Sequence, residues 1–313
     1  MRYVRQEIFI GKKNQDLTRK KTVSIIGLGA LGSVASELLT RAGIKELILI
    51  DRDYVELSNL QRQTIFDEND IGKSKAFVLK EKLNRINKEV KIQSYFDNLD
   101  NDNIKLIKSD LILDCTDNFE TRFLINDYCV KNKIPFIYSS SIGDSGYVFN
   151  IIPGEICFNC VFKEVNGLET CETFGVLNTI THLIASLQVN EALKILMNKE
   201  YEKNIIYINL ENNELIKIKA SKDKSCKVCS KKIFDYLEGR KNKEFIKFCG
   251  SSSYLFRGNF DVQKLKQKLN KEKVNFLNNI LILDKLTIFK NKVLIKAKDE
   301  KEAKSLYSKF IGN

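Results

Sequence analysis

The stretch that decides the fold is TVSIIGLGALGSVASELLTRAGIKELILID, residues 22–51. Its apolar runs at 22–26 and 47–50 predict two short buried strands. Between them, apolar residues recur with helical spacing and predict one apolar helix face: Leu31, Val34, Ala35, Leu38, Leu39 and Ala42. Gly43 follows as a glycine typical of a helix C-terminus. The stretch is therefore a βαβ unit, the building block of a parallel sheet.

The same alternation continues outward along the chain. Further helices are predicted near 76–86, 119–130 and 178–197, and further strands near 90–94, 110–114, 134–138 and 147–152. Strands that alternate with helices predict an α/β fold with a doubly wound, mostly parallel, Rossmann-like sheet.

The pattern changes near residue 235. Short strands at 279–283 and 292–297 flank helical stretches at 261–270 and 299–310, which predicts a small α+β module. We therefore expect two domains, a larger one over 1–234 and a small C-terminal one over 235–313.

Three glycines, Gly27, Gly29 and Gly32, stand between the first strand and the first helix, and Asp51 closes the second strand. Glycines at this spacing let a backbone approach phosphates at a helix N-terminus, and an acidic residue after the second strand can accept from ribose hydroxyls. The pattern predicts a nucleotide site. On this motif alone, NAD would be the first candidate ligand.

The residues that follow favour a triphosphate. Arg62 and Lys75 add cations that a pyrophosphate diester does not need, and Asn59 and Gln63 add neutral hydrogen-bonding groups. Such cations would neutralise phosphate charge and stabilise charge that develops as pyrophosphate leaves. Asp114 and Asp117 end a later strand, where one carboxylate could hold Mg²⁺.

The run from Asp51 to Gln63, with Lys75 and the segment from Asp114 to Asn118, closely resembles the ThiF/MoeB/HesA family, bacterial relatives of the ubiquitin-activating enzymes. The resemblance covers roughly residues 1–230 and includes an opening motif, RYVRQ at 2–6. It implies ATP-dependent adenylation of the C-terminal Gly-Gly carboxylate of a small ubiquitin-like sulfur-carrier protein.

The resemblance also implies roles for single residues. The glycine loop binds the nucleotide, Asp51 holds its ribose, and three side chains contact its phosphates: Asn59, Arg62 and Lys75. Asp117, next to Asn118, is associated with Mg²⁺. Arg5 reaches the triphosphate from a partner subunit, which implies a homodimer.

Four of the eight cysteines form two CxxC pairs, Cys157/Cys160 and Cys226/Cys229. Two such pairs predict a closed, tetrahedral and structural Zn²⁺ site, whereas a redox motif would need only one pair. The ion would attach the segment after the long helix to the α/β body.

The remaining cysteines and the single histidine have less specific surroundings. Cys171 lies in a polar loop, where the resemblance implies sulfur transfer through a covalent link to the carrier; an unreactive loop cysteine is the alternative. Cys115 and Cys129 are predicted to pack inside the protein, and Cys249 has no assigned role. His182 lies in the apolar helix and is predicted to be a packed core residue.

The charge is unevenly distributed. The chain has a formal net charge of +12, yet residues 1–220 contain 29 basic and 30 acidic residues, whereas residues 221–313 contain 23 and 10. This asymmetry suggests a basic appendage on a near-neutral body, so nucleic acid is not the expected partner. Excess positive charge there could attract an acidic carrier protein, or it could be a solvated lysine-rich surface.

The start of the sequence leads into no apolar run, and no apolar stretch has membrane-spanning length. We therefore expect no secretory leader and a cytoplasmic protein without membrane contact. The main hypothesis is adenylation of a thiamine-pathway sulfur carrier. Its alternatives are the molybdopterin-pathway equivalent, a peptide-adenylating enzyme of a modified-peptide cluster, an NAD-dependent oxidoreductase and a zinc-stabilised nucleotide-binding adaptor without turnover.

Overall fold

The computed structural model of the 313-residue chain describes residues 2–163, 174–241, 244–247, 253–269, 274–277 and 280–312. The chain forms two compact units, Met1–Arg240 and Lys241–Asn313. Each unit has its own sheet and its own hydrophobic core.

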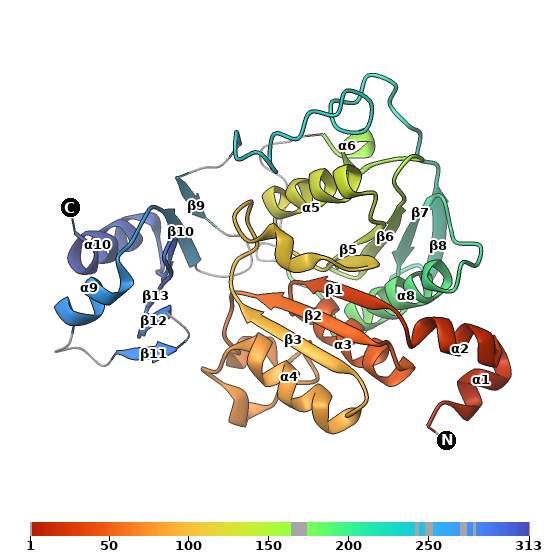
Figure 1. The fold of residues 1–313 in the computed structure, drawn as a ribbon, viewed down its shortest axis with the longest axis horizontal. Helices are drawn as coiled ribbons and strands as arrows, with labels where there is room; N and C mark the ends of the chain where they lie inside the picture. The colour runs from red at the N-terminus through yellow and green to blue at the C-terminus, as the bar shows by residue number, and fades with distance from the viewer. Residues whose placement is uncertain are drawn as a thin grey trace. The chain divides into compact units, whose positions relative to one another are not determined.

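The first unit is built on an eight-stranded sheet in the order β3-β2-β1-β4-β5-β6-β7-β8 (Figure 1). Strands β3, β2, β1, β4 and β5 are parallel, and β6, β7 and β8 continue the sheet in antiparallel fashion. The bounds are β1 Thr22–Ile26, β2 Glu46–Asp51, β3 Lys91–Phe96, β4 Leu111–Asp114, β5 Phe136–Ile142, β6 Ser145–Ile151, β7 Ile205–Asn209 and β8 Glu214–Ile218. The predicted doubly wound α/β fold is confirmed.

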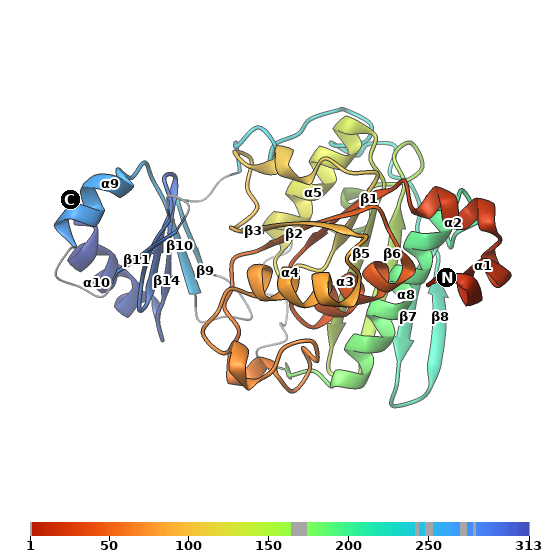
Figure 2. The ribbon, with the colours of Figure 1, turned by 60° about the horizontal axis from the view of Figure 1, so that its bottom comes forward.

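Helices cover both faces of this sheet (Figure 2). On one face pack α3 Ala30–Ala42, α4 Lys75–Ile86 and α8 Asn178–Leu196; on the other packs α5 Phe119–Asn132, next to the short α6 Phe158–Val161. Because side chains alternate along a strand, Val23 and Ile25 of β1 join the first core and Ile26 joins the second. The apolar runs of the central strands are therefore buried on both sides.

The helix α3 forms where its apolar stripe predicts. Leu31, Ala35 and Leu39 are buried on the sheet. Gly43 takes a left-handed conformation, with φ of 81°, and its N–H donates to the carbonyls of Leu39 and Thr40. A side chain at Gly43 would also collide with Tyr3, whose ring lies 2.5 Å from an added Cβ.

Two N-terminal helices, α1 Val4–Ile10 and α2 Lys12–Thr18, are not predicted by the sequence pattern. They lie at the C-terminal end of α3, where Gln6 and Gln15 both donate to the carbonyl of Ala42. Their stability therefore depends on a tertiary contact more than on an apolar stripe of their own.

The division between the units lies between Arg240 and Lys241, six residues beyond the predicted boundary. The intervening segment packs on α5: the ring of Tyr236 stacks on Phe123 at 5.2 Å, and the N–H groups of Tyr236 and Leu237 donate to the carboxylate of Asp127. These contacts make the segment part of the first unit.

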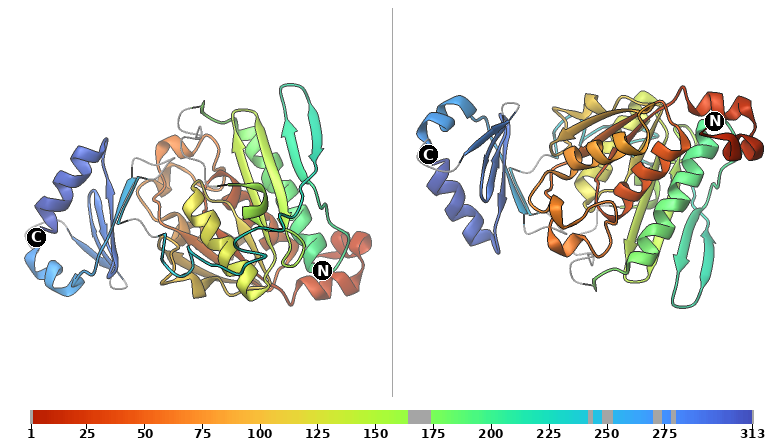
Figure 3. Two further views of the ribbon diagram at one scale, coloured as in Figure 1. Left: turned by 90° about the horizontal axis from the view of Figure 1, so that it is seen from above. Right: turned by 90° about the horizontal axis from the view of Figure 1, so that it is seen from below.

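The second unit is a six-stranded antiparallel sheet in the order β11-β12-β13-β14-β10-β9, with two helices on one face of it (Figure 3). Its strands are β9 Phe245–Lys247, β10 Ser253–Arg257, β11 Asn275–Leu277, β12 Ile280–Leu283, β13 Leu286–Ile288 and β14 Lys292–Lys296, and its helices are α9 Val262–Lys268 and α10 Glu300–Phe310. Within the described ranges, no helix of either unit has the length and apolar character to cross a membrane.

Candidate functional site

The glycine loop lies at the carboxyl edge of the parallel strands, between the ends of β1 and β4. Gly27 has φ of 83°, and a side chain there would meet the carbonyl oxygen of Cys115 at 2.6 Å. Gly32 packs the first turn of α3 against the loop, because an added Cβ would lie 1.9 Å from the carbonyl oxygen of Gly27.

Gly29 differs from both neighbours. An added Cβ would have only one contact, with Nε2 of Gln63 at 3.7 Å. The loop is therefore open at Gly29, at the N-terminus of a 13-residue helix whose first N–H groups favour an anion.

Asp51 fixes the shape of this loop. One carboxylate oxygen accepts from the N–H of Leu28 at 2.5 Å and the other from the N–H of Asp53 at 2.6 Å. Burial raises the pKa of Asp51, and the adjacent Asp53 carboxylate adds to the effect. Each oxygen keeps a second lone pair, so the carboxylate can still accept from a bound hydroxyl.

A tertiary turn brings Lys75 to this edge. The segments after β2 and before α4 pair with each other, through Val55 N–H to the carbonyl of Lys73 and Lys75 N–H to the carbonyl of Asp53. The side chain of Lys75 is 7% exposed and its Nζ lies 3.6 Å from the Asp53 carboxylate. A buried ammonium group beside the glycine loop is suited to binding phosphate.

Arg52, to which the sequence analysis assigns no role, links two of the acidic residues. Its guanidinium lies 3.5 Å from Asp117 and 3.8 Å from Asp53, and it donates to the side-chain oxygen of Asn98 at 3.1 Å. Burial opposes its charge, but the surrounding carboxylates raise its pKa above the usual value. The alternation of charge in Asp51-Arg52-Asp53 is the signal that could have identified it.

Of the two aspartates at the end of β4 and just after it, Asp114 and Asp117, only Asp117 is accessible to a ligand. Its side chain is 43% exposed, whereas Asp114 is fully buried, accepts from the N–H and hydroxyl of Thr116, and lies 3.9 Å from Arg122. Burial raises the pKa of Asp114. A carboxylate that could reach Mg²⁺ is therefore Asp117 and not Asp114.

The turn at 57–63 carries the neutral groups. Asn59 is buried and its side-chain oxygen accepts from the N–H of Glu56, which closes the 3₁₀ turn Leu57–Asn59. Gln63 is buried beside Gly29, and its Oε1 has no hydrogen-bond partner among the described residues. Arg62 is half-buried and donates to the carbonyl of Ser58 in its own turn.

Several predicted residues are not brought into this cluster by a contact. Asn118 caps α5, where its side-chain oxygen accepts from the N–H of Thr121. Arg5 is exposed on α1, at the end of α3 opposite to the glycine loop. Cys171 and Cys249 lie outside the described residues.

His182 is not packed in the core, contrary to the prediction. It is half-buried, its Nδ1 lies 2.8 Å from the carbonyl oxygen of Asn178, and its Nε2 lies 3.0 Å from the hydroxyl of Thr64. The position falls at the edge of the apolar stripe of α8, and both ring nitrogens are engaged. Cys115 and Cys129 do pack inside, half-buried and fully buried.

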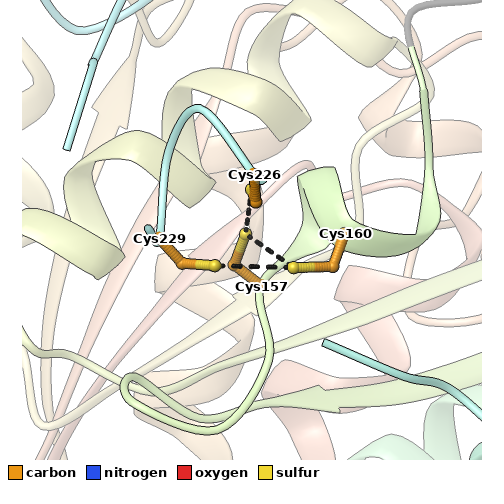
Figure 4. Close-up of side chains that lie close together, drawn as sticks. All are labelled: Cys157, Cys160, Cys226 and Cys229. Carbon is orange, nitrogen blue, oxygen red and sulfur yellow. Dashed lines mark hydrogen bonds between the residues drawn. The ribbon is translucent and has the colours of Figure 1, made fainter. Parts of the chain in front are cut away.

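The four cysteines of the two CxxC pairs converge (Figure 4). Their sulfur atoms lie within 4.8 Å of one another, with 3.5 Å between Cys157 and Cys226 and also between Cys160 and Cys229. These separations exceed a disulfide bond of about 2.05 Å and fit the edges of a tetrahedron with metal–sulfur bonds of about 2.3 Å. The donor set fits Zn²⁺ as predicted.

The cysteine cluster is attached to the body through α5. Asn126 accepts from the N–H of Phe158 at 2.9 Å and donates to the side chain of Asn159 at 2.7 Å. Burial raises the pKa of the Cys157 thiol and the neighbouring thiols add to it, so a metal ion would have to displace bound protons. An ion here would have no open position for a substrate, so its role would be structural.

Comparisons with known proteins agree with this geometry. The family model described as "ThiF family" matches residues 3–228. A "Sulfur carrier protein ThiS adenylyltransferase" of Bacillus subtilis (strain 168) is 34% identical over 333 aligned residues that cover 99% of each chain. A "Molybdopterin-synthase adenylyltransferase" of Escherichia coli (strain K12) is 35% identical over 73% of this chain and 96% of that protein.

Among solved structures, E. coli MccB crystallised with ATP superposes with a TM-score of 0.66 at 25% identity, over 73% of each chain. The glycine loop, the charged cluster around Lys75 and these similarities have one explanation. The chain belongs to the ThiF family, and it is an adenylyltransferase.

Proposed function

We propose that the protein uses ATP to adenylate the C-terminal carboxylate of a small ubiquitin-like sulfur-carrier protein, in the thiamine pathway. One observation carries the proposal. A glycine loop that is open at Gly29 is linked through Asp51 and Asp53 to the buried Lys75, in a chain aligned over 99% of its length with a ThiS adenylyltransferase.

The reaction needs positioning and charge neutralisation. A carboxylate oxygen of the carrier attacks the α-phosphorus of ATP, the bond between this phosphorus and the bridging oxygen breaks, and pyrophosphate leaves with the electron pair. No proton has to be removed from the attacking carboxylate, so a general base is not required. The site agrees with this, because it contains cations and amides. The histidine, His182, is not free to act as a general base, since its two ring nitrogens contact Thr64 and Asn178.

The residues divide into groups by what they would hold. The loop at Gly27, Gly29 and Gly32 would accept the phosphates on its N–H groups. Asp51 would accept from the ribose. The phosphate-facing side chains would be Asn59, Arg62, Gln63 and Lys75, of which Lys75 would have to exchange Asp53 for a phosphate oxygen.

Asp117 would hold Mg²⁺, with Asn118 beside it. Bound Mg²⁺ neutralises phosphate charge. Arg52 pairs with Asp117 at 3.5 Å and holds that carboxylate at the carboxyl edge of the sheet. Zn²⁺ at the four cysteines would stabilise the fold and would take no part in the chemistry.

Arg5 would complete the site from a second subunit. It is on α1, which also exposes Ile8 and Phe9, with 74% and 88% of their surfaces accessible. Exposed apolar side chains of this size favour an interface. We propose a homodimer in which each Arg5 reaches the triphosphate of the partner.

Cys171 would act after adenylation. Its thiolate would attack the carbonyl carbon of the acyl-adenylate, AMP would leave, and a thioester to the carrier would remain for sulfur delivery. Adenylation itself does not need this thiol. Removal of Cys171 should therefore leave pyrophosphate exchange intact and impair sulfur transfer.

The choice of a thiamine-type carrier over its alternatives is supported by the similarity to the B. subtilis ThiS adenylyltransferase along the whole chain. The relative from B. subtilis aligns with the second unit as well, whereas the molybdopterin-type relative aligns with 73% of the chain. The molybdopterin-type carrier and a short peptide are the alternative substrates. A basic second unit, with 17 basic and 7 acidic residues over 241–313, would favour encounter with an acidic carrier.

ATP–pyrophosphate exchange tests the proposal, with three candidate substrates tried separately: a thiamine-type carrier, a molybdopterin-type carrier and a peptide. Exchange that requires the thiamine-type carrier with its terminal Gly-Gly is the expected result. Exchange with another substrate would reassign the pathway, and nucleotide binding without exchange would favour the adaptor. NADH oxidation without exchange would overturn the activity.

Lys75→Ala should abolish exchange, because the buried ammonium group beside the phosphate loop is lost. Lys73→Ala is the matched control, since Lys73 is exposed on the same turn and contributes only its backbone to the pairing with Val55. Equal activity of the two variants would contradict the role given to Lys75.

A further inference from the structure

A cavity of about 500 Å³ lies at the edge of the sheet opposite to the glycine loop. It is lined by residues before β5 and after β6, whose paired ends at Phe136 and Ile151 form the amino edge of the parallel strands. The other lining residues come from the C-terminal ends of α5 and α8 and the segments after them, and Lys232 comes from the segment after Cys229. No lining residue belongs to the adenylation site. Its walls are largely apolar, with Val130, Pro135, Ile152, Pro153 and Ile195.

Three lysines, Lys133, Lys199 and Lys232, also line the cavity, and none of the lining residues is acidic. None of the three ammonium groups forms an ion pair with another residue that the structure describes. Glu155 accepts from the hydroxyl of the lining residue Tyr201, and its carboxylate lies 3.8 Å from Lys203. The cavity therefore combines an apolar wall with three exposed ammonium groups that pair with no carboxylate among the described residues.

The backbone around the cavity is strained. In the described part of the chain, four non-glycine residues have positive φ, and three of them line this cavity: Lys133 at 57°, Asn198 at 55° and Lys232 at 58°. Glycine adopts this left-handed conformation without the steric cost that a lysine has. Two lysines thus occupy positions that glycine would fill at lower free energy, and their side chains line one cavity.

We propose that this cavity binds a small organic phosphate monoester with an apolar or aromatic body. Three cations suit a doubly charged phosphate better than a single carboxylate, and the apolar wall suits the attached organic group. The strain at Lys133 and Lys232 is then the cost of presenting two ammonium groups to the ligand. The proposal does not depend on the identity of the adenylated substrate.

Phenyl phosphate is a suitable probe, titrated by calorimetry into the full-length, zinc-loaded protein. The titration uses the Lys75→Ala background, which removes the buried cation beside the phosphate loop. We expect saturable binding with one site per chain that is weaker for inorganic phosphate and absent for benzyl alcohol. Binding of inorganic phosphate with equal affinity would overturn the apolar part of the site, and no binding of phenyl phosphate would overturn the proposal.

Lys133→Gly and Lys232→Gly separate a binding role from a structural one. Each should weaken phenyl phosphate binding roughly fivefold, through loss of one cation, and raise the thermal midpoint by roughly 2 °C, through relief of strain. Asn213→Gly is the matched control: Asn213 has φ of 55° in the turn between β7 and β8, away from the cavity. It should raise the midpoint and leave binding unchanged.

These outcomes are decisive in both directions. If the lysine-to-glycine variants gain stability and still bind phenyl phosphate as the parent does, Lys133 is only a helix-end residue, Lys232 is only a turn residue, and the proposal fails. Zinc content is measured for Lys232→Gly, which lies three residues after Cys229. If that variant loses zinc, Lys133→Gly alone decides.

Discussion

Alanine substitutions at Gly29 and Gly32 test the roles proposed for the glycine loop, because an added methyl group has space at Gly29 and collides with backbone at Gly32. At Gly32 an added Cβ would lie 1.9 Å from the carbonyl oxygen of Gly27 and 3.3 Å from Cβ of Cys115. At Gly29 its single contact would be an ordinary one, at 3.7 Å. We expect Gly32→Ala to affect stability and Gly29→Ala to affect ATP binding.

The magnitude for Gly32→Ala follows from the overlap. A distance of 1.9 Å is about 1 Å shorter than the closest approach that real Cβ atoms show. The Cβ would be fixed to the backbone of α3 and the oxygen belongs to the backbone of the loop, so no side-chain rotation can relieve the overlap and the loop and the helix must separate. Overpacking of this kind lowers the free energy of unfolding by up to about 3 kcal/mol, whereas replacing glycine by alanine inside a helix raises it by about 1 kcal/mol. The net loss is about 2 kcal/mol, or a fall of about 4–8 °C in thermal midpoint for a unit of this size.

For Gly29→Ala we expect a change in unfolding free energy below about 1 kcal/mol, because the new methyl group points into open space. The same methyl group would keep a phosphate from the backbone N–H groups. ATP binding should weaken at least about tenfold, which corresponds to 1.4 kcal/mol. Thermal melting of each variant, with and without ATP, and the ATP dependence of pyrophosphate exchange measure both effects.

Two results would refute the reasoning. A Gly32→Ala protein that melts like the wild type would mean that the helix does not pack on the loop as described. A Gly29→Ala protein with an unchanged ATP requirement would mean that phosphate does not approach the loop at Gly29, and the proposed nucleotide site would have to lie elsewhere.

Three further predictions concern the segment that links the zinc cluster to the second unit. Burial raises the pKa of Asp127 to about 7, above its value of about 3.9 in the unfolded chain, so its contribution to stability is full at low pH and is lost as the pH rises through 7. In denaturant titrations, the free energy of unfolding of the wild-type protein should fall by on the order of 1 kcal/mol between pH 6 and 8.5, and that of Asp127→Asn should fall less. The same fall with pH in both proteins would contradict the raised pKa of Asp127. Metal analysis of the wild-type protein should find about one zinc ion per chain. Cys226→Ser should lower both the zinc content and the thermal midpoint. A wild-type protein that is stable without metal would exclude a structural ion. A chain that ends at Arg240 should have the same thermal midpoint as the first unit in the full-length protein. A chain that ends at Phe234 should have a lower midpoint, because it lacks the Tyr236 stack on Phe123 and both N–H donors to Asp127. Equal midpoints would show that residues 235–240 do not stabilise the first unit.

The fold was predictable where local pattern and tertiary environment agree. The strand at 22–26, the helix that ends at Gly43 and the alternation through β6 all carry an apolar period that matches their burial. The helices α1 and α2 were not predictable in this way, because they are held by side-chain hydrogen bonds to the carbonyl of Ala42 and by Tyr3 against Gly43. No periodic pattern encodes such a contact.

The same distinction applies to the candidate site. The residue types and their order along the chain predicted the glycine loop, the cations and the two cysteine pairs. They did not predict that Arg52 contacts Asp117, that Asp114 is buried against Arg122, or that His182 uses both nitrogens. Each of these depends on which side chains meet across strands or turns that are far apart in the sequence.

The sequence by itself determined the chemistry available to this protein: a phosphate-binding loop, nearby cations and two pairs of thiols. Spacing along the chain is enough for these, because each is a local motif whose backbone geometry follows from its residues. Only the tertiary structure decided how they combine. Lys75 meets Asp53 because two turns pair, and the four sulfur atoms converge because α5 binds one cysteine loop through Asn126 and the segment after the other through Asp127.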